Sequence, residues 1–136
     1  MKTLLLCCAV LAVGIGAAIP LAQPTELAGM YLCDGTDLKG QSYNAAVEIA
    51  AHGEVWALRW VYQNGDQGEG FGILETDVLS VIFKNGSSIG WAAYRVQRDG
   101  PALTLVGRWA GPGAPTLATE TLTKTKARSI DELRGP

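Results

Sequence analysis

A carboxylate on an apolar strand face is the strongest candidate for chemistry in this chain. Glu120 lies between Ala118 and Leu122 at alternate positions, so in an extended strand the three side chains face the same way. The two apolar neighbours place Glu120 on the face that the core buries, although Leu117 makes the opposite row partly apolar as well. Because a buried carboxylate is costly unless it is hydrogen-bonded, we expect Glu120 to have partners.

Two interpretations of Glu120 stay open. In the first, it is a structural residue near the mouth of the fold, bonded to a tyrosine or to a backbone amide. In the second, it is the polar anchor of a ligand whose body lies against aromatic side chains, since small-molecule sites are mostly apolar with few polar groups. The candidate ligand-binding residues are then Glu120, Tyr94, Tyr43, Tyr31, Trp56, Trp60 and Trp109. The tryptophans are expected first of all to supply core burial.

Other motifs for chemistry are weak. No second carboxylate shares the face of Glu120 at a catalytic spacing, and His52, the one histidine, falls in a predicted turn. The glycines of 68–72 lack the third spacing of a dinucleotide fingerprint. Asp34, Asp37 and Asp99 are explained by turn chemistry. We therefore expect a protein that is not an enzyme and that uses no metal or cofactor.

Length and charge narrow the class further. A chain of 136 residues with 48% hydrophobic residues is sufficient for one packed domain. The formal net charge of −2 includes Lys2, so the chain beyond the apolar leader carries −3. This balance disfavours nucleic acid and anionic lipid as partners.

The first residues have the build of a secretory signal. Lys2 precedes an apolar run from Leu4 to Ala18, and small residues allow cleavage after Ala18 or Ala22. This run is shorter than the roughly 20 residues of a membrane-spanning helix. We expect residues 1–22 to be a signal peptide and the mature protein to be secreted or periplasmic, with no membrane attachment after cleavage.

Cys33 is then the one cysteine of the mature chain. No internal disulfide can form, so stability must come from packing. A small buried residue is the expected role of Cys33, with intermolecular pairing or a reactive thiol as the alternatives.

The elements that must position these residues are predicted to be strands. In the stretch from Glu54 to Phe83, the large side chains of 56, 58, 60 and 62 lie on one face, and Asn64-Gly65 supplies two residues suited to positive φ in a hairpin turn. The next strand carries Gly68, Gly70 and Gly72 on one face, and Trp56 and Trp60 are expected to cover that bare backbone.

The same alternation predicts eight strands, at 27–33, 41–51, 54–62, 67–74, 78–84, 87–97, 102–110 and 116–124. The inward face of the sixth strand is not decided by its pattern. Short turns make strands that are neighbours in sequence pair with each other, and closure of the sheet would remove its two edge strands with their unpaired backbone groups. We therefore predict an all-β, eight-stranded antiparallel up-and-down barrel over 27–125, with a flattened β-sandwich as the alternative. The polar tail 126–136 is expected to fray, although Ser129 could cap one helical turn.

A resemblance supports this architecture. Gly29-Met-Tyr31 at the start and Leu105-Val-Gly107-Arg-Trp109 near the end resemble small ligand barrels of the avidin and lipocalin type. The avidin pattern has tryptophan where Tyr31 stands, so no biotin site is carried over. Over about residues 28–124 the chain is similar to uncharacterised secreted bacterial proteins, some of which carry a fibronectin-binding label. The motifs that carry this similarity are Gly29-x-Tyr31-x-Cys33, Trp56-x-Leu58-x-Trp60, Gly70-x-Gly72-Ile73, Gly90-x-x-x-Tyr94, Leu105-x-Gly107-x-Trp109 and Glu120-x-Leu122.

Two functions remain open at this stage. The first is an exported, non-catalytic barrel that binds a small apolar or aromatic ligand inside, which requires a cavity. The second is an extracellular or envelope protein-interaction module whose outer face and loops, including Trp91 and the 111–115 loop, bind a partner. An exposed Trp91 within an apolar patch would be its signature.

Overall fold

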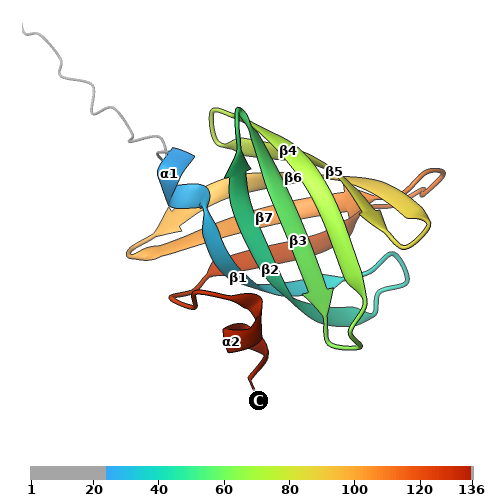
Figure 1. The fold of residues 1–136 in the computed structure, drawn as a ribbon. Helices are drawn as coiled ribbons and strands as arrows, with labels where there is room; N and C mark the ends of the chain where they lie inside the picture. The colour runs from blue at the N-terminus through green and yellow to red at the C-terminus, as the bar shows by residue number, and fades with distance from the viewer. Residues whose placement is uncertain (1–23, 136) are drawn as a thin grey trace, which may run out of the picture.

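The strands close into a barrel. The computed structural model describes residues 24–135, which form a closed, all-antiparallel barrel in which each strand pairs with its neighbours in sequence and the first pairs with the last (Figure 1). The elements are α1 (Pro24–Leu27), β1 (Gly29–Thr36), β2 (Ser42–His52), β3 (Val55–Tyr62), β4 (Gln67–Glu75), β5 (Val78–Asn85), β6 (Ser88–Asp99), β7 (Ala102–Ala110), β8 (Ala118–Lys124) and α2 (Ile130–Arg134). The predicted barrel is confirmed, and the sandwich alternative is wrong because β1 and β8 pair from Tyr31–Lys124 to Thr36–Thr119.

The predicted signal peptide, residues 1–22, lies outside the described residues. In the described part of the chain, neither helix is long and apolar enough to cross a membrane.

The first strand differs most from the prediction. β1 extends to Thr36, through Asp34-Gly35, which the sequence suggested as a polar connection. Asp34 is exposed on the outer face, where the side-chain amide of Asn44 on β2 donates to it at 2.5 Å. The turn comes later, where one carboxylate oxygen of Asp37 accepts the backbone N–H groups of Lys39 and Gln41, both at 2.8 Å. The sequence prediction therefore ended the first strand three residues too early, at Cys33, while the turn chemistry expected of Asp37 is confirmed.

The hairpin turns also differ in detail. Gly65 has φ +89° but Asn64 does not adopt positive φ, so the β3–β4 turn is not the expected pair of left-handed residues. Tyr62 and Asp66 close it instead, through a Tyr62 N–H to Asp66 carbonyl bond of 2.9 Å. The Asn85–Ser88 pair leaves Gly86 first in a two-residue turn, with φ +60°, the place where a type II′ turn favours glycine.

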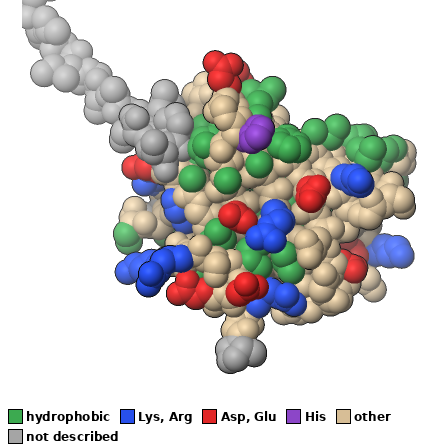
Figure 2. All heavy atoms as spheres, in the orientation of Figure 1, with side chains coloured by type: hydrophobic (Ala, Val, Ile, Leu, Met, Phe, Trp, Pro, Cys, Tyr) green, Lys and Arg blue, Asp and Glu red, His purple; other side chains and the backbone are tan. Residues whose placement is uncertain are grey.

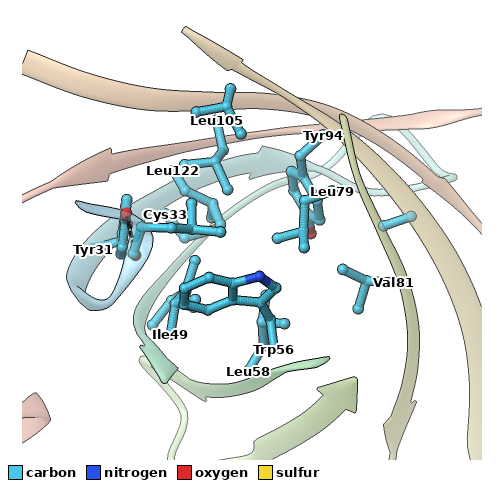
Figure 3. Packing of buried hydrophobic residues seen from close by; sticks show 14 of the residues in the cluster. Tyr31, Cys33, Ile49, Trp56, Leu58, Leu79, Val81, Tyr94, Leu105 and Leu122 are labelled. Atoms are coloured by element: carbon cyan, nitrogen blue, oxygen red, sulfur yellow. Dashed lines mark hydrogen bonds between the residues drawn. The ribbon is translucent and has the colours of Figure 1, made fainter. Parts of the chain in front are cut away.

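The interior is divided along the barrel axis. One half, next to α1, is filled by apolar side chains that point toward one another, among them Ile49, Trp56, Leu58, Leu79, Leu105 and Leu122 (Figure 3). In β6 the inward face is the row that contains Tyr94 and Val96, both buried. The opposite half, where β2, β4, β6 and β8 begin, holds most of the remaining aromatic residues.

The tail does not fray. Ser129 caps α2 by accepting the Glu132 N–H at 3.2 Å, and Ile130 is 5% exposed. Ile130 packs on Met30, Ala46 and Val61, which form a second small apolar cluster on the outside of β1, β2 and β3. The ribbon of α2 lies outside the barrel, beside β1 and β2 (Figure 1). This outer cluster is what gives the helical turn its stability, and the sequence prediction overlooked it.

Candidate functional site

Glu120 lies inside the barrel, as its strand alternation predicts. It is 5% exposed on β8, between the buried Ala118 and Leu122, while Leu117 is exposed on the outer face. Its two register partners on the neighbouring strands are glycines, Gly35 on β1 and Gly107 on β7.

These two glycines open paths to Glu120. Tyr43 pairs with Gly35, and Tyr94 pairs with Gly107, so each tyrosine lies two strands from Glu120 with a glycine between them. A Cβ atom at Gly35 would lie 2.2 Å from the Tyr43 ring, and one at Gly107 would lie 2.3 Å from the Tyr94 ring. Only bare backbone allows both rings to cross the intervening strand, because real side-chain atoms do not approach this closely. The row Tyr–Gly–Glu–Gly–Tyr is thus one structural unit.

The carboxylate receives three hydrogen bonds from neutral donors. The Tyr94 hydroxyl donates to Oε1 at 2.8 Å, and the Trp60 indole N–H donates to the same oxygen at 3.1 Å. The Tyr43 hydroxyl donates to Oε2 at 2.5 Å and accepts the Trp109 indole N–H at 2.9 Å. An indole N–H can only donate, so the Tyr43 hydrogen is free to point at Glu120. The structural interpretation of Glu120 is confirmed to this extent: its partners are side chains, two of them predicted tyrosines.

Burial and the charge of Glu120 keep these groups protonated. Burial first, and then the negative charge of Glu120, raises the pKa of Tyr43 and of Tyr94 above the ordinary value of 10.0. The same two causes, in the same order, raise the pKa of Tyr62 and of the buried Cys33 thiol. Protonated hydroxyls are what Glu120 needs as donors, so the cluster is self-consistent at neutral pH.

A cavity of about 1050 Å³ opens at this end of the barrel. Its aromatic wall consists of Tyr43, Trp60, Tyr62, Phe83, Tyr94 and Trp109, and Glu120, 5% exposed, also lines it. Adjacent rings contact one another: the centroid distances are 6.0 Å for Tyr43–Tyr62, 6.5 Å for Tyr43–Trp109, 5.9 Å for Phe83–Trp109 and 6.2 Å for Trp60–Phe83. The rings therefore form a continuous wall.

Trp60 is held in place by the glycine strand. A Cβ atom at Gly70 would lie 3.1 Å from the Trp60 ring, and one at Gly68 would lie 3.7 Å from the Trp60 Cβ. Gly72, opposite Trp56, is instead approached most closely by Val81 and Leu79. The predicted pairing of tryptophan with glycine thus holds for Trp60, while the nearest neighbours of Gly72 come from β5.

The mouth of the cavity is polar and lacks cationic residues. Among the described residues that line the cavity are Asp37, Ser42, Asn44, Asn64, Asp66, Asn85 and Ser88, and none is Lys, Arg or His. Both aspartates already bind groups of their own turns, Asp37 the amides described above and Asp66 the Asn64 side chain at 2.8 Å.

Two of the predicted site residues lie elsewhere. Tyr31 is completely buried in the filled half, where its hydroxyl donates to the Leu27 carbonyl at 2.7 Å. Trp56 belongs to the same half (Figure 3). Neither lines the cavity, whereas Tyr43, Trp60, Tyr94, Trp109 and Glu120 do.

The sequence reasoning did not assign Tyr62 or Phe83 to the site. The signal for Tyr62 was present, since it shares the strand face of Trp60. The role of Gly35 and Gly107 was not visible, because it depends on the register of five strands, β2, β1, β8, β7 and β6.

Within the described residues, no group of three or more His, Cys, Asp and Glu side chains could hold a metal ion.

The comparisons with known proteins give a fold and no family. No family model matches the chain, and no curated protein matches it. Among solved structures, it is similar to EF1p2_mFAP2b bound to DFHBI, with 15% identity, a TM-score of 0.53, and coverage of 76% of this chain and 95% of the other. It is also similar to the redesigned β-barrel mFAP1 bound to DFHBI, with 17% identity, a TM-score of 0.50, and coverage of 75% and 96%. At this level of identity the likeness supports the barrel fold alone.

Proposed function

We propose that this protein is an exported, non-catalytic barrel that binds a small apolar or aromatic ligand in its open half. The observation that carries the proposal is the cavity itself, with its continuous aromatic wall around one buried carboxylate. Small-molecule sites have this composition, mostly apolar with a few fixed polar groups. The barrels of similar fold were solved with DFHBI bound, which supports the idea that such a barrel accepts a ligand.

The absence of catalysis is part of the proposal. Glu120 is held by three donors, so it is positioned to fix a geometry and not to exchange a proton with a substrate. Export is inferred from the apolar leader alone.

The test uses a matched pair of phenylalanine variants and a neutral fluorescent probe, N-phenyl-1-naphthylamine. Phe83 lines the cavity, whereas Phe71 is 54% exposed on the outer face of β4. We expect saturable binding to the wild-type chain, at least about tenfold weaker binding to Phe83→Ala, and unchanged binding to Phe71→Ala. Equal losses in the two variants, or no saturable binding, would contradict the proposal.

A second function, the binding of a protein partner, is supported by an exposed apolar patch on the outer face. Trp91 is 51% exposed and pairs across the outer face with Ile82 at 60%, which pairs with Phe71. Figure 2 shows hydrophobic side chains gathered beside the histidine, along the edge formed by β4 and β5. An exposed apolar patch of this kind is typical of an interaction surface.

The interaction function is tested by affinity capture from the envelope fraction of the native host. A specific partner retained by the wild-type chain and by Phe83→Ala, but lost with Trp91→Ser, would support it. A partner that Trp91→Ser retains in full would contradict it.

A further inference from the structure

We infer that the ligand of the open half is a protonated amine with an apolar or aromatic body. This inference rests on the proposed function and adds the charge class of the ligand. It depends on four features of the cavity: an unpaired negative charge, a free acceptor position, an aromatic wall and an acidic mouth.

The charge of Glu120 has no cationic partner in the described chain. The ion pairs there are Arg59–Glu48, Arg95–Asp77 and Arg98–Glu26, all on the outside. The groups that donate hydrogen bonds to Glu120 are two hydroxyls and an indole, and these, like the nearby buried Cys33 thiol, are neutral. Neutral donors do not compensate the negative charge of an ionised carboxylate, so a cation that enters the cavity gains an electrostatic interaction at low local dielectric.

One acceptor position of the carboxylate remains. An ionised carboxylate offers about four lone-pair positions. Oε1 receives Tyr94 and Trp60, whereas Oε2 receives Tyr43 alone. An ammonium N–H can occupy the remaining position on Oε2, which a carboxylate or another acceptor on a ligand cannot.

The wall also favours a cation. Five rings, those of Tyr43, Trp60, Tyr62, Phe83 and Trp109, contact one another around the cavity. The faces of Trp and Tyr attract ammonium groups within about 6 Å, most strongly when the ion is desolvated.

The mouth of the cavity is negatively charged, which also favours a cation. Asp37 and Asp66 line it, and the described lining contains no basic side chain. A cleft lined by one sign of charge concentrates counter-ions of the other sign, and here the favoured ions are cations.

The experiment compares three probes of nearly equal shape by calorimetry at pH 7 and low salt: 2-naphthylmethylammonium, 2-naphthylmethanol and 2-naphthoate. The wild-type chain is expected to bind the amine at least about tenfold more tightly than the alcohol, and the alcohol more tightly than the carboxylate. An alcohol or a carboxylate that binds as tightly as the amine would overturn the inference while leaving the proposed function intact. If none of the three binds, the proposed function itself fails.

A pair of variants assigns the preference to Glu120. We expect Glu120→Gln to reduce the preference for the amine over the alcohol to less than about threefold, while Glu69→Gln, which removes an exposed carboxylate from the outer face of β4, leaves it unchanged. A full preference retained in folded Glu120→Gln would overturn the inference. The comparison of the three probes uses the wild-type chain only, so it tests the preference for the amine even if Glu120→Gln does not fold.

Discussion

Gly35 and Gly107 determine whether the tyrosines can reach Glu120. They lie beside Glu120 on β1 and β7, and the Tyr43 and Tyr94 rings occupy the space where their side chains would be. Each glycine in a strand adds to the conformational entropy that is lost on folding, and it has no side chain to bury. Here the cost is offset by the two hydrogen bonds that Tyr43 and Tyr94 donate to a charged group, which are stronger than neutral ones.

The Gly107→Ala variant tests this crossing. A methyl group 2.3 Å from the Tyr94 ring must displace it, so we expect the free energy of unfolding to fall by about 1–3 kcal/mol, as for other overpacked interiors. Gly111→Ala is the control, because its Cβ would meet its nearest neighbour, the Ile89 carbonyl, at 3.5 Å. Denaturant unfolding measures both. Equal stability of the two variants would show that the ring does not need the bare backbone.

The Tyr94→Phe variant tests the donor itself. Tyr94 is 1% exposed, so water cannot replace its hydroxyl at Oε1 without rearrangement. Loss of a hydrogen bond to a charged group predicts a fall of about 1.5–3 kcal/mol in the free energy of unfolding. Tyr62→Phe, at a half-buried residue that lines the open end and does not bond to Glu120, should cost no more than about 1 kcal/mol. A smaller cost for Tyr94→Phe than for Tyr62→Phe would contradict the network.

The strands illustrate what alternation can and cannot predict. It placed Glu120, Tyr43 and Trp60 inside and Leu117 outside, because period two specifies the face of each side chain. It does not specify height along the barrel axis, which depends on the register of all eight strands. For this reason alternation groups Tyr31 and Trp56 with the residues of a cavity that lies in the other half of the barrel.

The stability of α2, for which Ser129 was the expected cap, could not be predicted for a related reason. Its own sequence is short and polar, and such a segment frays alone. Its stability comes from Ile130 on the outer cluster of Met30, Ala46 and Val61, which strand alternation assigns to solvent. Tertiary packing thus determines that this part of the tail is helical.

The Ile130→Ala variant tests that packing. Because Ile130 is 5% exposed, we expect a loss of about 2 kcal/mol or more in the free energy of unfolding, the lower part of the range for buried Ile to Ala. Ile82→Ala, at 60% exposure, is the matched control and should change stability by less than about 0.5 kcal/mol. Amide exchange of residues 130–134 would rise in Ile130→Ala alone. Unchanged protection there would contradict the docking of α2.

The barrel as a single unit has a predictable response to alkaline pH. All four tyrosines and Cys33 have a pKa raised by burial, above ordinary values of 10.0 and 9.0. Above these ordinary values the unfolded chain releases protons that the folded chain retains. The free energy of unfolding therefore falls as pH rises past about 9–10, while the contribution is fully present below that range.

Tyrosine absorbance at 295 nm checks this directly. We expect little phenolate in the folded protein near pH 10, and then a single steep rise that coincides with loss of the β-sheet circular dichroism signal. A gradual titration centred near pH 10, with the sheet signal intact, would contradict the burial of the tyrosines.

The central claim, a ligand site in the open half, is tested most directly by the indole N–H signals of the four tryptophans in a nuclear magnetic resonance titration. The chain places them in three environments: Trp60 and Trp109 in the cavity wall, Trp56 in the filled half and Trp91 on the outer face. Single Trp→Phe variants assign the signals, and 2-naphthylmethylammonium is the probe. We expect saturable shifts of the Trp60 and Trp109 signals, with Trp56 and Trp91 nearly unchanged. A shift confined to Trp91, or no saturable shift of Trp60 and Trp109, would contradict the claim.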